Sequence, residues 1–289
     1  MGLLRIYLLG ILQKIESIMR VFTAFLFLSF FGSAQISLET TWLPKSTNET
    51  SGLEVFGDYL VTHNDSGDKP KLYILSQKGE KIMEIELNEL THKDWEDIAA
   101  DSDYFYVADT GNNYATREDL KIYILDRHFF HQGTISIRYK AQTSFVKTSR
   151  NEFDAEALAV VGDQLHLFSK NRKTLQSEIY TFPKIAGNYT LTPRAVLDTQ
   201  SLVTAADYSA EDDLMVMTGY NFEGDQFFYT IPNFRKNGYD NLELQKYLIP
   251  IKPAQIEAVK IISKEEYWLS SEDEGKNRPR LFRARLNVE

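Results

Sequence analysis

After residue 34, short runs of alternating apolar and polar residues follow one another along the chain. This period of two is typical of β-strands with one buried face. No segment in this part of the chain keeps the 3.6-residue period of an amphipathic helix over a useful length. The 16 Tyr and 18 Phe residues also favour strands. The pattern therefore predicts an all-β fold.

The strands are grouped in a repeat. Each repeat begins with an acidic or small residue and an apolar strand, continues through a polar turn into an alternating strand, and ends in a polar loop. Five segments follow this plan, at 51–67, 95–113, 155–172, 203–220 and 255–273. A third strand follows each segment, at 71–76, 120–126, 178–183, 226–231 and 280–286, and a fourth follows four of them, at 81–87, 135–141, 190–197 and 242–249. Four short strands repeated about every 40–50 residues indicate a β-propeller.

The repeats predict five blades within a single domain at 35–289, and six blades stay open because the second repeat is long. The last repeat has only three strands. A spare strand at 36–42 fits as its fourth, which would close the ring and remove an unpaired edge.

The first 34 residues are predicted to be a signal peptide. An apolar run at 21–31 follows Arg20 and precedes the small residues Gly32, Ser33 and Ala34, so cleavage is expected before Gln35. The alternative is a membrane anchor, but a span needs about 20 apolar residues and this run is shorter. If translation starts at Met19, residues 1–18 are a mis-assigned extension. We expect an exported protein, in the periplasm, on the outer surface or secreted, with no membrane span in the mature chain.

The net charge and the composition limit the classes of partner that the protein is expected to bind. The formal net charge of −9 argues against nucleic acid and anionic membranes, which attract basic surfaces. It is compatible with a cation and with a small-molecule, glycan or protein ligand, and we expect a monomer. The chain contains no Cys, which excludes disulfides, thiolate zinc sites and cysteine nucleophiles.

Carboxylates recur where the innermost strands of such a ring begin. Glu96, Glu156 and Glu257 hold this position in three repeats, and Glu54 and Asp207 are expected as its equivalents in the first and fourth. These strand starts open onto one face at the mouth of the central channel. Carboxylates held close together repel, so they require a cation, a basic side chain or raised pKa values. The basic candidates on that face are Arg117, Lys170 and Arg172.

Two loops rich in Asn, Asp and Gly are expected on the same face, THNDSGD at 62–68 and ADTGNN at 108–113. They add Asn64, Asp65, Asp109 and Asn112 to the three glutamates as predicted metal ligands. Carboxylate and amide oxygens suit Ca²⁺ or Mg²⁺. The alternative is that these loop residues only form tight turns through their own backbone.

Two functions stay open. In the first, a metal at the channel mouth supports ligand binding or hydrolysis of a phosphoester or lactone. Asp97 or His63 would then act as the base, and Arg117 would hold an anionic substrate. In the second, the protein is a non-catalytic module that binds an envelope protein or a glycan, and His63 is structural. Whether the protein is an enzyme is left open.

Several segments together resemble a family of exported bacterial β-propeller proteins. They are THNDSGDKPKLYIL, DWEDIA, YVADTGNN, KIYIL, AEALA, TAADYS and YWLSSE. The resemblance covers nearly the whole mature chain and implies a fold but no established activity. More distantly, the plan is similar to phytase-like and gluconolactonase-like propellers. That similarity implies divalent cations at the channel mouth, held by residues at the positions of Glu96, Glu156 and Glu257. The residues GSAQ at the end of the signal are similar to those of exported proteins of the Bacteroidetes.

Overall fold

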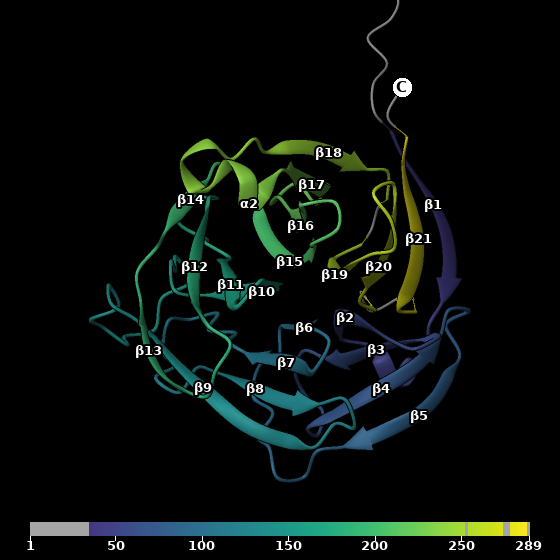
Figure 1. Ribbon diagram of the computed structural model, residues 1–289, viewed down its shortest axis with the longest axis horizontal. Helices are drawn as coiled ribbons and strands as arrows, with labels where there is room; N and C mark the ends of the chain where they lie inside the picture. The colour runs from purple at the N-terminus through teal and green to yellow at the C-terminus, as the bar shows by residue number, and fades with distance from the viewer. Residues whose placement is uncertain (1–34, 252–253, 274–277, 288–289) are drawn as a thin grey trace, which may run out of the picture. The chain divides into compact units, whose positions relative to one another are not determined.

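Five sheets stand around a central axis in the computed structural model, which describes residues 35–251, 254–273 and 278–287 (Figure 1). The predicted signal peptide at 1–34 lies outside the described residues. Each sheet contains one of the five repeats, with its first strand nearest the axis. The prediction of a five-bladed β-propeller is confirmed, and the described residues form no sixth blade.

The strands of each blade are given from the axis outward. The first blade contains β2 (Thr50–Phe56), β3 (Tyr59–Asn64), β4 (Lys71–Ser76) and β5 (Lys81–Glu86), and the second contains β6 (Asp97–Ala100), β7 (Tyr104–Asp109), β8 (Lys121–Asp126) and β9 (His131–Tyr139). The third blade contains β10 (Ala155–Val161), β11 (Gln164–Ser169), β12 (Ser177–Pro183) and β14 (Ala195–Leu197), the fourth contains β15 (Leu202–Ser209), β16 (Leu214–Tyr220), β17 (Gln226–Pro232) and β18 (Gln245–Ile249), and the fifth contains β19 (Ile256–Ile261), β20 (Glu266–Ser271), β21 (Arg280–Asn287) and β1 (Gln35–Trp42). Three short helical turns lie between strands: η1 (Lys45–Thr47), α2 (Phe234–Asn237) and η2 (Tyr239–Asn241).

The N-terminal strand closes the ring, as predicted. β1 is hydrogen-bonded to β21 and forms the outer strand of the fifth blade, so the two ends of the propeller belong to one sheet. Ile36 of β1 is buried. The last blade therefore has the same four strands as the others, and the outer edge of β21 is covered.

The predicted strand at 190–197 is wrong as a single element. β13 (Gly187–Leu191) leaves the third blade and pairs in parallel with β9 of the second, while the short β14 completes the third. Pro193 stands between them and has no backbone N–H, so one continuous ladder cannot pass through it. The result is a strap between two neighbouring blades.

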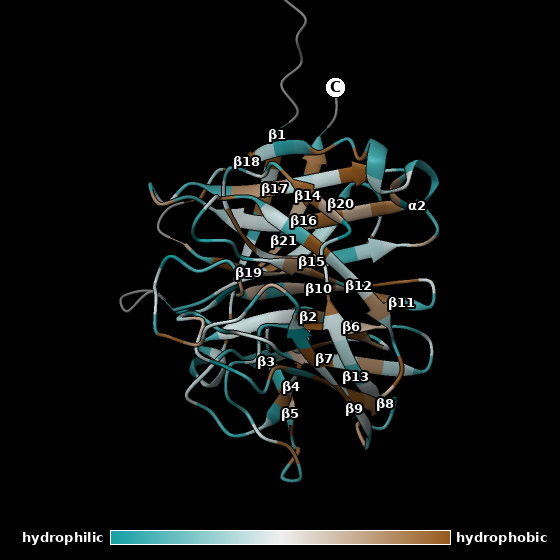
Figure 2. Ribbon diagram, turned by 90° about the vertical axis from the view of Figure 1, so that its left-hand side faces the viewer, coloured by the Kyte–Doolittle hydropathy of each residue, from teal (hydrophilic) through white to brown (hydrophobic). Residues whose placement is uncertain are grey.

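Apolar packing between blades forms the core. In the first two blades, the second and third strands are buried on both faces over most of their length, because a neighbouring sheet covers each face. Between the first and second blades, Val61, Leu72, Trp95 and Phe105 belong to one buried cluster. Figure 2 shows that apolar residues concentrate in the strands and hydrophilic residues mostly in the loops. In the part of the chain that is described, no helix has the length and hydrophobicity that a membrane span requires.

Hydroxyl groups near the axis connect consecutive blades. Thr110 donates a hydrogen bond to the carbonyl of Ala155 in the third blade, at 2.9 Å. Thr204 donates to the carbonyl of Ile256 in the fifth blade, at 2.6 Å, and Ser51 donates to the carbonyl of Glu96 in the second. These bonds satisfy backbone groups where the innermost strands begin, and they fix the blades relative to one another at the channel.

Removing β1 should destabilise the ring. A chain that starts at Leu43 instead of Gln35 loses the burial of Ile36 and exposes the edge of β21. We expect its melting temperature to fall by about 5–10 °C, with more aggregation. Thermal unfolding of the two chains, followed by circular dichroism, measures the difference. Equal melting temperatures would contradict the closing role of β1.

Candidate cation site

A β-bulge lies near the start of the innermost strand in the third, fourth and fifth blades. The pairing register shifts between Ala155 and Ala157 in the third blade, so Glu156 is an extra residue. The same shift singles out Thr204 in the fourth blade and Glu257 in the fifth. A β-bulge re-aims the side chain of the extra residue, and such bulges are common beside functional sites.

Three overlapping groups of carboxylates lie at this end of the channel. Within each group, one oxygen from every residue lies within 4.8 Å of the others. The groups are Glu49, Asp65 and Glu272; Asp65, Asp94 and Glu96; and Glu96, Asp154 and Glu156. Because Asp65 and Glu96 are each shared by two groups, the carboxylates form a continuous arc, which we call the mouth arc. The structure thus brings Glu96 and Glu156 together, whereas Glu257, the third glutamate expected with them, belongs to none of these three groups.

Glu96 lies at the centre of the mouth arc. Its side chain is 3% exposed, and its Oε1 atom has no hydrogen-bond partner among the described residues. Burial, together with the nearby carboxylates of Glu156, Asp65 and Asp94, raises the pKa of Glu96 well above its usual value. An oxygen in this position is costly unless a proton or a cation satisfies it.

Gly111 of the ADTGNN loop makes room for these carboxylates. A Cβ atom at residue 111 would lie 1.9 Å from Oε1 of Glu96 and 2.4 Å from Cγ of Asp94. Its backbone N–H also donates to the carbonyl of Asp94, at 3.2 Å. The glycine is required here because the loop backbone passes directly against the carboxylates.

The third group already contains basic side chains. Lys170 forms an ion pair with Glu156, and both are buried. Arg172 forms an ion pair with Asp154 and lies 3.6 Å from Glu156. Two of the three basic residues predicted for this face therefore neutralise one end of the mouth arc.

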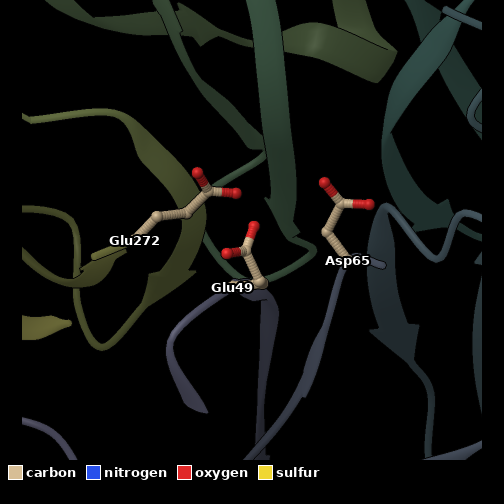
Figure 3. A group of neighbouring side chains, drawn as sticks. All are labelled: Glu49, Asp65 and Glu272. Carbon is tan, nitrogen blue, oxygen red and sulfur yellow. The ribbon is translucent and has the colours of Figure 1, made fainter. Parts of the chain in front are cut away.

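The other end of the mouth arc is more open. Figure 3 shows the carboxylates of Glu49, Asp65 and Glu272 turned toward one another, from the residues before β2, after β3 and after β20. All three are half-buried. Burial and neighbouring acids raise the pKa of Asp65 to about 8 and that of Glu272 to about 9. Glu257, which accepts a hydrogen bond from the amide of Gln255, is among those acids.

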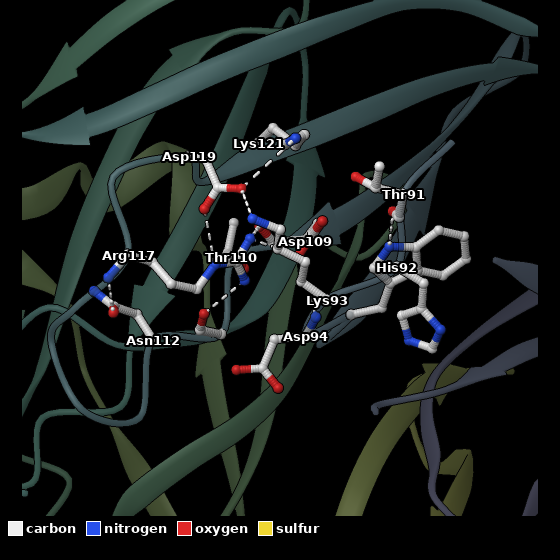
Figure 4. Close-up of polar contacts among 12 residues, drawn as sticks. Thr91, His92, Lys93, Asp94, Asp109, Thr110, Asn112, Arg117, Asp119 and Lys121 are labelled. Carbon is white, nitrogen blue, oxygen red and sulfur yellow. Dashed lines mark hydrogen bonds and ion pairs between the residues drawn. The ribbon is translucent and has the colours of Figure 1, made fainter. Parts of the chain in front are cut away.

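The predicted ligands Asp109 and Asn112 lie beside the mouth arc in a separate network (Figure 4). Asp109 forms an ion pair with Arg117 at 2.8 Å and accepts a hydrogen bond from the backbone of Asp94. Asn112 accepts a hydrogen bond from the backbone of Arg117 and donates to the carbonyl of Phe153. Arg117 also contacts Asp119 and the carbonyl of Gly111. This network positions the ADTGNN loop, and Arg117 is committed to it.

Asn64 and His63 precede Asp65 at the end of β3. Asn64 donates to the carbonyl of Ser46 and to the carboxylate of Asp68, which orders the THNDSGD loop. His63 is fully buried and packs edge-to-face against Trp95 with ring centroids 5.6 Å apart. Burial lowers the pKa of His63 to about 3, so its ring is neutral. The side chains of Asn64 and His63 are both buried and are not exposed to solvent at the channel mouth.

Asp97, the other predicted base, points across the axis. Its Oδ2 accepts hydrogen bonds from the backbone of Leu158 in the third blade and Ala206 in the fourth, at 2.8 and 3.2 Å. Its Oδ1 accepts a third from Ile98. The carboxylate is buried, and all of these bonds go to backbone amides.

Glu54 and Asp207 are not the counterparts of Glu96, Glu156 and Glu257, which we call the ring glutamates. Both form ion pairs with Lys260, at 2.7 and 3.0 Å, farther along the innermost strands. Both stand level with Lys260, three residues beyond the glutamate position, so the match by residue type alone was wrong. The residues at the glutamate position in the first and fourth blades are Ser51 and Thr204, whose hydroxyls connect blades.

The sequence carried a signal for the acids that were missed. Asp94 and Asp154 each stand two residues before a ring glutamate, and Glu49 stands two residues before Ser51. This acid-x-Glu or acid-x-Ser spacing recurs in three of the five blades. Glu272 directly follows β20, at a place comparable to that of Asp65 after β3.

Comparison with known proteins supports the fold. No family model matches the sequence, and no curated protein sequence matches it. Among solved structures, the PQQ-bound aldose sugar dehydrogenase of Streptomyces coelicolor is similar, with 13% identity and a TM-score of 0.51 over 88% of this chain and 99% of that chain. A chain of the mitotic checkpoint complex is 11% identical, with a TM-score of 0.45 over 83% and 78% of the two chains. At these identities, the likeness concerns the fold alone.

Gly111→Ala should disturb the mouth arc without unfolding the ring. The new Cβ displaces the flexible carboxylates of Glu96 and Asp94, so we expect a fall in melting temperature of only a few degrees and loss of any stabilisation by added Ca²⁺. Gly187→Ala is the control, because its Cβ would meet no atom closer than 3.4 Å. A calcium response in Gly111→Ala equal to that of the unchanged protein would contradict the packing argument.

The metal-free protein should lose stability as the pH rises. Asp65 and Glu272 have higher pKa values in the folded chain, about 8 and 9, than their ordinary values of 3.8 and 4.5. The folded state therefore binds more protons, and its stability falls from about pH 4 through about pH 9. Urea unfolding in EDTA across this range measures the slope. Asp65→Asn should flatten it, while Glu89→Gln on an exposed loop should not. A stability that rises over this range would contradict the assignment.

Proposed function

We propose that the channel mouth binds a divalent cation, Ca²⁺ or Mg²⁺, through Asp65, Asp94 and Glu96, and that this cation holds an oxygen-bearing ligand. One observation carries the proposal: Oε1 of Glu96 is buried without a hydrogen-bond partner among the described residues, beside two further carboxylates. Lys170 neutralises Glu156, but no ion pair is formed by Asp65, Asp94 or Glu96 within the described part of the chain.

The spacing of the three carboxylates supports this assignment. Their ligand oxygens lie within 4.8 Å of one another, about twice the Ca–O distance of roughly 2.3–2.6 Å. Carboxylate oxygens are the ligands that hard cations prefer. The nearby Asn113 supports Asp94 by donating its amide N–H to that carboxylate at 3.4 Å, and its own oxygen accepts from Arg172.

The ligand would approach from the face of the loops. Asp65 and Asp94 are half-buried, whereas Glu96 lies beneath them. Ca²⁺ takes about six to eight oxygens, so three carboxylates leave positions for oxygens of a ligand. A glycan hydroxyl, a phosphoester or a lactone carbonyl meets this requirement. A protein carboxylate on an envelope partner meets it as well.

Hydrolysis of a phosphoester or lactone is the second candidate. A divalent ion supplies polarisation of a phosphoryl or carbonyl oxygen and activation of water. The observation in favour is that Glu272, a half-buried carboxylate grouped with Asp65, lies beside the three proposed ligands without being one of them. Glu272 replaces Asp97 and His63 as the candidate base, because both of those side chains are enclosed.

We further propose that the mature chain begins at Gln35 and works outside the cytoplasm. The apolar run at 21–31 followed by small residues supports export. Extracellular calcium modules commonly have dissociation constants of about 10⁻⁴–10⁻³ M. An affinity in that range would suit an exported protein.

Calcium and magnesium titrations test the cation site. We expect saturable binding of Ca²⁺ or Mg²⁺ by calorimetry and a rise in melting temperature, both lost in Glu96→Gln, which removes the buried charge and keeps the shape. Glu223→Gln, an exposed residue that belongs to none of the three carboxylate groups, is the control. Unchanged melting at millimolar metal would reject the site. Turnover of phosphate esters or lactones that depends on the metal would then favour hydrolysis over plain binding.

A further inference from the structure

Lys170 is a cation that the chain itself places among the ring glutamates. It follows β11, and its side chain is 4% exposed. Its ammonium group contacts Glu156 and lies 5.0 Å from the centre of the Tyr220 ring. Although burial acts to lower it, the charges of Glu156 and Glu257 raise the pKa of Lys170 well above its usual value. The residue is therefore a permanent positive charge at the mouth.

The group that Lys170 occupies has the spacing of a cation site. Glu96, Asp154 and Glu156 are all buried, and their ligand oxygens lie within 4.8 Å of one another, as in the group of Asp65, Asp94 and Glu96. The two groups share Glu96, whose Oε1 has no hydrogen-bond partner within the described residues. The two groups differ in their counter-charges, because only the group of Glu96, Asp154 and Glu156 is paired with basic side chains, those of Lys170 and Arg172.

We infer that Lys170 keeps a second divalent cation out of the group of Glu96, Asp154 and Glu156. The inference rests on the proposed function, since it concerns the same mouth arc. The ammonium group contacts Glu156, one of the three carboxylates that would otherwise hold this ion, and its charge repels an ion from that end. Lys170 is thus a specificity-determining residue that directs the ion to Asp65, Asp94 and Glu96.

Removing the ammonium group of Lys170 would leave buried negative charge without its counter-charge. Without Lys170, the three buried carboxylates of this group face only the guanidinium of Arg172. A buried charge that loses its partner is strongly destabilising. A second divalent cation would offset this cost, so the variant should gain both an ion and a dependence on it.

Ion stoichiometry tests the inference. Calcium binding is measured by calorimetry and by equilibrium dialysis on the unchanged protein, Lys170→Gln and Lys170→Arg. We expect one ion per chain for the unchanged protein and for Lys170→Arg, which keeps the charge, and two for Lys170→Gln. Lys173→Gln is the control on the same loop: its side chain is 52% exposed and pairs with Glu152, so one ion is expected.

Each outcome decides between the two claims. One ion in both the unchanged protein and Lys170→Gln overturns the role of Lys170 and leaves the proposed function intact. No ion in the unchanged protein overturns the proposed function itself. If Lys170→Gln unfolds in EDTA, refolding at saturating Ca²⁺ supports the inference, because the ion replaces the ammonium group. A variant that stays unfolded at saturating Ca²⁺ overturns it.

Discussion

Neutralisation of buried negative charge along the axis is the constraint on which the ring depends. A propeller brings the starts of distant strands together, and this chain places carboxylates there at several levels. Lys260 neutralises Glu54 and Asp207, backbone amides satisfy Asp97, and Lys170 with Arg172 neutralise Glu156 and Asp154. Asp65, Asp94 and Glu96 form no ion pair with a basic side chain within the described part of the chain. The candidate site is therefore a place where the chain leaves negative charge uncompensated.

The fold was predictable because its information is local and repeated. Each blade is an antiparallel meander whose strands follow one another in sequence, so alternation and turn residues suffice to count five of them. The pairing of β13 with β9 could not be predicted in this way. It joins residues about fifty positions apart, and it depends on an open edge of the second blade that exists only after folding.

The candidate site was predictable in part. Glu96 and Glu156 were expected to meet because they occupy the same repeat position, and they do. Glu54 and Asp207 were placed at the wrong level, because the first and fourth blades carry Ser51 and Thr204 at the glutamate position and the next acid along each strand lies three residues farther on. Asp97 and His63 carry reactive groups that are engaged or enclosed by neighbouring blades. Such contacts arise from the tertiary arrangement and cannot be read from residue type.

The carboxylate of Asp97 has a consequence for the size of the ring. This short side chain, which starts on the second blade, reaches backbone amides on both the third and the fourth. Adding a blade would widen the circle of innermost strands, and a two-carbon side chain could then no longer span to both neighbours. The hydrogen bonds of this single aspartate therefore favour a ring that closes after five blades over a larger ring of the same repeats.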